Sequence, residues 1–143
     1  MPDLRKEFIL LKMQDLKTFL DEIKPLVEIT FIEYKKDYVK RHAVEKLVEL
    51  IVELASDINR NVIEAQQGSP ASNYYNTFTQ LGELNVLPEA LSLRLASTTG
   101  LRNRLVHRYE EIDHKIVYHS AVRLLPDYLQ YFKLIEKYLK SAK

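Results

Sequence analysis

The sequence of 143 residues contains no cysteine, only three glycines and five prolines, and no long hydrophobic run. Without cysteine, disulfide bonds, thiolate catalysis and cysteine-ligated zinc or iron–sulfur centres are excluded, which agrees with a reducing cytoplasm. No apolar run approaches the roughly 20 residues that a membrane-spanning helix needs. The first residues, MPDLRKEF, do not place a basic stretch before an apolar one, so we expect no signal peptide and a cytoplasmic protein without a membrane partner.

Charges of the two signs almost cancel, with 21 Lys and Arg against 20 Asp and Glu. Any contact with nucleic acid must therefore come from a local basic patch rather than from the field of the whole chain. Apolar residues make up 46% of the sequence and charged residues 29%, a composition typical of a globular protein. We expect residues 1–143 to form a single helical domain with its own hydrophobic core.

Apolar residues recur at intervals of three and four, which predicts helices rather than strands. Asp3 is expected to cap a first helix, and Pro25 to kink it or mark its last turn. The residues Phe31-Ile32-Glu33-Tyr34 are expected to be a short connection. The most regular element is a long second helix, predicted over about 37–67.

The second half of the chain continues the helical pattern. A short helix is predicted over 74–84, and a fourth helix is expected to start at Pro88 and run into residues 100–113. Asp113 is expected to cap the last helix. The inward side chains of the short helix are predicted to be Tyr75, Phe78 and Leu81. The fold class is therefore an all-α, antiparallel bundle of four to five helices.

The predicted helix over 37–67 carries two adjacent apolar stripes, whereas one buried face needs only one. Two readings remain open: a wide core face within the bundle, or a second stripe that contributes to a homodimer seam. The first stripe consists of Ala43, Leu47, Leu50, Ile51, Leu54, Ile58 and Val62, and the second of Val44, Val48, Val52 and Ala55.

A row of polar side chains at four-residue spacing follows the same helix. Its members are Glu45, Glu49, Glu53, Asp57 and Asn61. Such a row is commonly the solvated edge of a helix. Alternatively one member faces the basic residues of 100–113, and Asp57 is the candidate.

The segment 100–113, GLRNRLVHRYEEID, concentrates groups suited to phosphodiester chemistry. Arg102 can hold a phosphate by paired hydrogen bonds, and Arg104 and Arg108 are further candidates for phosphate contact. His107 can move a proton near neutral pH. Tyr109 adds a phenol two residues later.

Helical geometry separates the two most reactive groups of this segment. Asn103 and His107 lie one turn apart on one face, whereas Arg102 and His107 lie about 140° apart. Their side chains therefore diverge on a regular helix. Two copies facing each other across a two-fold axis would bring two Arg and two His to one cleft, so a homodimer is expected.

These groups suffice for RNA cleavage by the neighbouring 2′-hydroxyl, with His107 as the base and Arg102 offsetting charge on the phosphate. We expect no metal and no cofactor, because the other histidines lack a helical His-x3-His pairing. His114 and His119 are read as surface residues. The alternatives without catalysis are that His107 caps the helix and that the basic residues stabilise its carboxyl end.

The segment resembles the Arg-x4-His-x-Tyr signature of HepT-type toxins in the HEPN ribonuclease superfamily. The likeness extends over most of the chain, including the pattern of the second helix and the turn before the fourth. It is carried by Gly100-Leu101-Arg102-Asn103, Leu105-Val106-His107, Tyr109-Glu110-Glu111-Ile112-Asp113, Arg41-His42-Ala43-Val44-Glu45-Lys46, Glu53-Leu54-Ala55-Ser56-Asp57-Ile58, Tyr75, Phe78, Leu81 and Val86-Leu87-Pro88.

The resemblance implies a HEPN helical bundle that acts as a homodimer with a composite cleft. The implied activity is that of a metal-independent endoribonuclease, the toxin of a pair with a minimal nucleotidyltransferase antitoxin. By position, Arg102 and His107 are the implied catalytic pair, supported by Asn103 and by Asp57, which would orient Arg102. Tyr109 matches the tyrosine that the antitoxin modifies with AMP.

Two other functions are compatible with these residues. The first is a catalytically idle nucleotide- or RNA-binding module that partners a nucleotidyltransferase; the near-neutral charge argues against tight nonspecific RNA binding. The second is a structural helical dimer in which Arg102 and Asp57 form a buried ion pair.

Overall fold

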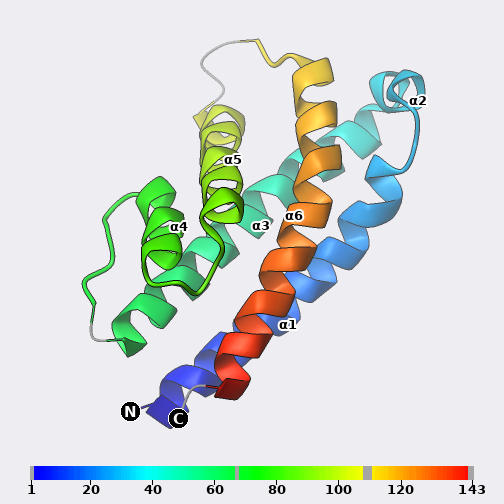
Figure 1. Ribbon diagram of the computed structural model, residues 1–143. Helices are drawn as coiled ribbons and strands as arrows, with labels where there is room; N and C mark the ends of the chain where they lie inside the picture. Colours follow the sequence, from blue (N-terminus) through cyan, green and yellow to red (C-terminus); the bar gives the residue numbers. More distant parts are fainter. Residues whose placement is uncertain (1, 67, 108–110, 142–143) are drawn as a thin grey trace.

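The structure is a computed structural model that describes residues 2–66, 68–107 and 111–141. Within these ranges it contains six helices and no strand (Figure 1). The all-α bundle is confirmed, with one more helix than the sequence predicts. The helices are α1 (Pro2–Val27), α2 (Phe31–Lys36), α3 (Tyr38–Ala65), α4 (Tyr74–Glu83), α5 (Glu89–His107) and α6 (His114–Ser141).

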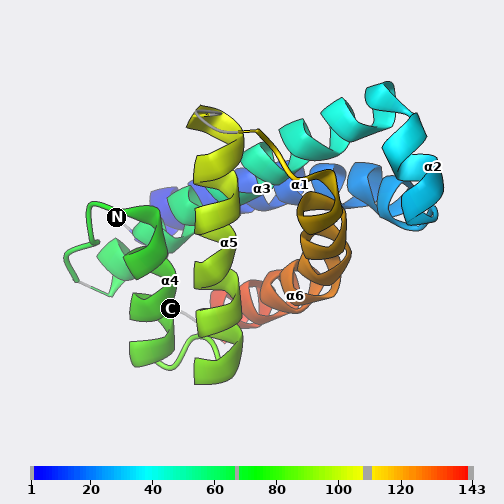
Figure 2. The ribbon, with the colours of Figure 1, turned by 90° about the horizontal axis from the view of Figure 1, so that it is seen from above.

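Helix α3 is the axis of the bundle and packs against all the other helices. α1 lies along one side of it, α6 packs on α1 and α5, and α4 and α5 form an antiparallel pair beside α3 (Figures 1 and 2). The start of α1 and the end of α6 lie at the same end of the molecule, and the carboxyl end of α5 lies at the other (Figure 1). No described helix is long and apolar enough to cross a membrane.

Both apolar stripes of α3 are used inside the protomer. Val44, Val48, Val52 and Ala55 are 0% exposed and belong to the same continuous core as the first stripe. Of the two interpretations left open by the sequence, the wide core face within the bundle therefore holds, and the second stripe is not a homodimer seam. α3 needs a wide apolar face because α1 packs on one side of it and α4, α5 and α6 on the others.

A buried chain of hydrogen bonds links α6 to the first turn of α4 through α3. The Tyr131 hydroxyl donates to Asn59 Oδ1 at 2.6 Å, and Asn59 Nδ2 donates to Thr77 Oγ1 at 3.2 Å. The Thr77 hydroxyl in turn donates to the Tyr74 carbonyl at 2.8 Å. Burial raises the pKa of Tyr131 well above its ordinary value, so the hydroxyl is a permanent donor. These bonds fix the first turn of α4 relative to the core.

Local signals set the helix boundaries. The Asp37 carboxylate accepts from the amides of Val39 and Lys40 at the start of α3, and Asp113 accepts from those of Lys115 and Ile116 at the start of α6. The prediction for Asp113 is confirmed.

Three local predictions are wrong. Residues 31–34 are not a connection but the start of α2, which begins because Thr30 accepts from the Glu33 amide. Asp3 lies inside α1, which already begins at Pro2. Tyr75 is 45% exposed, because Thr77 fills the inward position of α4 together with Phe78.

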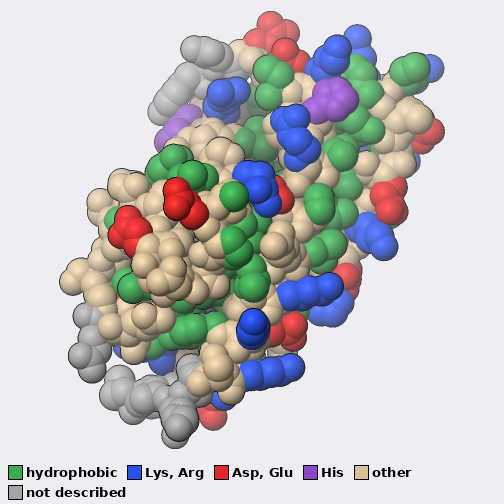
Figure 3. All heavy atoms as spheres, in the orientation of Figure 1, with side chains coloured by type: hydrophobic (Ala, Val, Ile, Leu, Met, Phe, Trp, Pro, Cys, Tyr) green, Lys and Arg blue, Asp and Glu red, His purple; other side chains and the backbone are tan. Residues whose placement is uncertain are grey.

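The α4–α5 turn depends on a glycine at a close approach. A Cβ on Gly82 would overlap the Ser92 side chain of α5, so any other residue here requires that side chain to shift. The surface elsewhere mixes charges: on the face in Figure 3, Lys and Arg side chains are interspersed with Asp and Glu. This mixture agrees with the net charge of +1.

Candidate functional site

The candidate residues lie in the last two turns of α5, at its carboxyl end. Leu105 is 1% exposed and anchors this end of the helix in the core, with Leu101 packed against the core one turn earlier. Arg102 and His107 therefore project from a rigid helix rather than from a loop.

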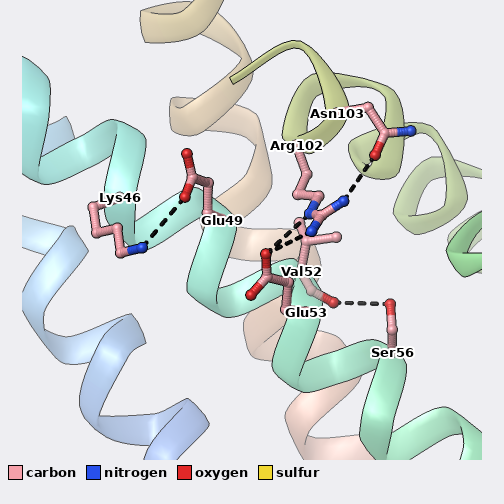
Figure 4. Close-up of polar contacts among 7 residues, drawn as sticks. All are labelled: Lys46, Glu49, Val52, Glu53, Ser56, Arg102 and Asn103. Atoms are coloured by element: carbon pink, nitrogen blue, oxygen red, sulfur yellow. Dashed lines mark hydrogen bonds and ion pairs between the residues drawn. The ribbon is translucent and has the colours of Figure 1, made fainter. Parts of the chain in front are cut away.

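Arg102 is held by a carboxylate of α3 (Figure 4). Its Nε and Nη2 atoms donate to Glu53 Oε2 at 3.1 and 2.8 Å, and Nη1 donates to Asn103 Oδ1 at 3.1 Å. A guanidinium carries five N–H groups, and these bonds use three of them. Among the described residues, one N–H on each Nη atom has no acceptor.

An aromatic ring of α4 also contacts the same guanidinium. The Arg102 Cζ atom lies 4.7 Å from the centroid of the Tyr74 ring, within the range of a cation–π contact. Helices α3 and α4 thus hold the side chain of Arg102 from two sides, and only 18% of that side chain is exposed.

The prediction that Asp57 orients Arg102 is wrong, because Glu53 occupies that place one turn earlier on α3. Asp57 pairs with Lys12 of α1 at 3.4 Å, and its side chain is 54% exposed. The two carboxylates differ by about 40° around the helix, which is enough to point one toward α5 and the other toward α1. The structural-dimer alternative expected a buried ion pair between Arg102 and Asp57. Arg102 pairs with Glu53 instead, and this pair is partly exposed.

A hollow of about 540 Å³ lies between the end of α5 and the start of α6. Both Asn103 and His107 line it, whereas Arg102 turns away to α3 and α4. Asn103 therefore connects the two catalytic candidates, since it accepts from Arg102 and borders the hollow. The complete lining is Leu101, Asn103, Arg104, Leu105, His107, Glu111, Ile112, Asp113, Ile116 and Val117.

Not all predicted site residues meet. Arg104 and His107 share the hollow, but Arg102 faces the other side of α5, as the helical angle predicts. Arg108 and Tyr109 lie outside the described residues.

The histidines of α6, His114 and His119, are not among the residues that line the hollow. His119 is exposed and stacks on Phe31. His114 is half-buried, contrary to the expectation that it is an exposed surface residue, and its Nδ1 atom is buried with no hydrogen-bond partner among the described residues. Among the described residues, no group of three or more His, Asp or Glu is arranged to hold a metal ion.

Two residues of the site were missed by sequence reasoning. Glu53 carries a signal, since it stands in the polar row of α3 at four-residue spacing from Asp57. Tyr74 carries none, because its role depends on how α4 packs against α5, which local spacing does not encode.

Comparison with known proteins gives one consistent answer. A family described as "Ribonuclease HepT-like" matches residues 16–135. The tRNA nuclease HepT of Aphanizomenon flos-aquae is 31% identical over 121 residues, which cover 85% of this chain and 82% of the relative. The mRNA nuclease HepT of Shewanella oneidensis is 32% identical over 108 residues, or 73% of this chain and 78% of the relative.

Solved structures agree in fold. A crystal structure of a toxin–antitoxin with AMP-PNP has a TM-score of 0.82 at 26% identity, and the match covers 92% of this chain and 98% of that one. A tri-AMPylated Shewanella oneidensis HEPN toxin in complex with MNT antitoxin has a TM-score of 0.81 at 28% identity, with 90% and 96% covered. The predicted HEPN-like bundle and the predicted endoribonuclease class are thereby confirmed. The chain belongs to the HepT-like ribonuclease family.

Proposed function

We propose that this ribonuclease is the toxin of a pair with a minimal nucleotidyltransferase, and that it acts in the cytoplasm with Arg102 and His107 as its catalytic residues. The observation that carries the proposal is the way in which the Arg102 guanidinium is held in place. Glu53, Tyr74 and Asn103 fix its guanidinium, and two of its N–H groups have no acceptor in the part of the chain that the structure describes. Asn103 links it to the hollow that His107 lines.

These groups supply a complete reaction without a metal. His107 takes the proton of a ribose 2′-hydroxyl, and the 2′-oxygen attacks the adjacent phosphorus. The bond from phosphorus to the 5′-oxygen breaks, and a second imidazole or a water protonates the leaving oxygen. The products are a 2′,3′-cyclic phosphate and a 5′-hydroxyl. Arg102 offsets the charge on the phosphate oxygens, with Arg104 and Arg108 as further contacts.

A homodimer supplies what one protomer separates. On a single α5, Arg102 and His107 diverge by about 140°. We expect a two-fold axis to set the ends of two α5 helices against each other, so that the groups of both protomers line one cleft. The His107 of one protomer and the Arg102 of its partner then act on the same phosphate.

The antitoxin is expected to silence this cleft covalently. A HEPN toxin similar to this chain has been solved in tri-AMPylated form in complex with MNT antitoxin. By extension, the antitoxin of this chain transfers AMP to the hydroxyl of Tyr109. Each AMP adds a phosphodiester anion and a bulky base two residues after His107 in the sequence, which is expected to neutralise basic groups of the cleft and to exclude RNA.

His107→Ala is expected to lower RNA cleavage by at least about 100-fold, the lower range of general acid–base catalysis. Cleavage is measured on labelled RNA with a chelator present, and the oligomeric state by light scattering. His119→Ala, an exposed histidine of α6, is the matched control and retains activity. Full cleavage by His107→Ala would remove this residue from the mechanism, whereas RNA binding without turnover by the native protein would favour the idle binding module.

Glu53→Gln is expected to lower kcat about tenfold, since the charge that holds the Arg102 guanidinium is lost while the side-chain shape is kept. Asp57→Asn, one turn away on the same helix, is the control and changes kcat by less than about twofold. Single-turnover cleavage distinguishes the two variants. A larger loss in Asp57→Asn than in Glu53→Gln would contradict the assignment of Glu53.

Co-expression with its cognate nucleotidyltransferase is expected to raise the intact mass of this chain by one or more AMP groups. Tyr109→Phe abolishes or reduces this increase because the accepting hydroxyl is gone. Tyr75→Phe, which removes an exposed hydroxyl on α4, leaves it unchanged. Unaltered modification of Tyr109→Phe would place the accepting group elsewhere.

A further inference from the structure

Arg60 of α3 is a second cation on the ring that holds Arg102. Its Cζ atom lies 5.9 Å from the centroid of Tyr74, and the Cζ atom of Arg102 lies 4.7 Å from the same centroid. The two guanidinium carbons are therefore at most about 11 Å apart, which a stacked strand covers in about three nucleotides at ~3.4 Å each.

The charge of Arg60 is not neutralised by the acidic residues nearest to it on α3. Asp57, three residues earlier, pairs with Lys12, and Glu64, four residues later, pairs with Arg5, both at 3.4 Å. Glu53 is engaged by Arg102. Arg60 itself forms no ion pair within the described ranges 2–66, 68–107 and 111–141.

The hydrogen bonds of Arg60 are also incomplete. Its Nη2 atom donates to the carbonyl of Ser72 at 3.0 Å, which fixes the plane of the guanidinium. The Nε atom is buried and has no acceptor among the described residues. Nη1 likewise has no acceptor in the described structure, but it is not buried, so its N–H groups reach solvent. A half-buried, fixed and unneutralised guanidinium favours an anion.

We propose that Arg60 binds a second phosphate of the RNA strand, within about three nucleotides of the phosphate held by Arg102. This inference rests on the proposed function, since it takes RNA as the ligand. Arg60 is assigned a binding role and not a catalytic one, because it is not among the residues that line the hollow bordered by His107. The strand then follows the edge formed by α3 and the first turn of α4.

The test measures binding of a mixed-sequence, single-stranded RNA of about 12 nucleotides, a common site size for such binders, by fluorescence anisotropy at several salt concentrations. His107→Ala protein is the parent, so that the RNA stays intact. Adding Arg60→Gln is expected to reduce the slope of log K against log salt by about 0.7, the loss of one phosphate contact. Arg94→Gln, which removes an exposed arginine of α5 paired with Asp127, is the control and leaves the slope unchanged.

Cleavage kinetics give an independent readout. In the native background, Arg60→Gln raises KM and leaves kcat unchanged, and Arg60→Lys, which keeps the charge, restores the salt slope. If Arg60→Gln does not fold, as judged by circular dichroism, Arg60→Met replaces it, since its stem keeps the packing on Tyr74. An unchanged slope in the folded variant overturns the inference alone. Absence of RNA binding by the parent overturns it together with the proposed function.

Discussion

The ion pair between Arg102 and Glu53 is the contact on which the site depends. With 18% and 37% of the two side chains exposed, it contributes on the order of 1 kcal/mol or less to stability. Ordering an arginine side chain costs about 2 kcal/mol of rotamer entropy, so the pair alone does not fix it. The ring of Tyr74 adds about 0.5–1 kcal/mol and Asn103 a further hydrogen bond. Together these contacts offset the entropy and position one cation without contributing much to the fold.

A net charge of +1 does not prevent the chain from presenting a local basic site, because the acidic residues can be paired elsewhere. Three acidic residues of α3 form ion pairs with basic residues of other helices: Glu53 with Arg102, Asp57 with Lys12, and Glu64 with Arg5. Under the proposed function, the cations that meet RNA would therefore be set by the partners that these carboxylates take rather than by an excess of basic residues.

The sequence predicts those parts of the molecule that local patterns determine. The length of α3 follows from its two stripes, and the start of α6 follows from the capping carboxylate of Asp113. The position of Arg102 and His107 at the carboxyl end of α5 follows from the helical pattern that runs into the motif. Even their divergence is predictable, because it depends only on the helical period.

Packing decides the features that the sequence did not reveal. Glu53 and Asp57 are both carboxylates in one row at four-residue spacing. Only the paths of α1 and α5 across α3 decide that Glu53 pairs with Arg102 and Asp57 with Lys12. The six-residue α2 is too short for its apolar period to be read and depends on a cap by Thr30. Tyr74 and Tyr75 are adjacent, and only the register of α4, set by the buried Asn59, turns the first toward Arg102.

The central claim is that two protomers share one cleft, and mixing two inactive variants tests it most directly. Arg102→Ala and His107→Ala chains, carrying different tags, are co-expressed, and the mixed dimer is isolated by two affinity steps. Since Glu53 is partly exposed, removing Arg102 leaves no buried charge, and both variants are expected to fold. The account predicts that each variant alone is inactive and that the mixed dimer cleaves RNA, with one Arg102 and one His107 from opposite chains. A mixed dimer as inactive as its parents would contradict it.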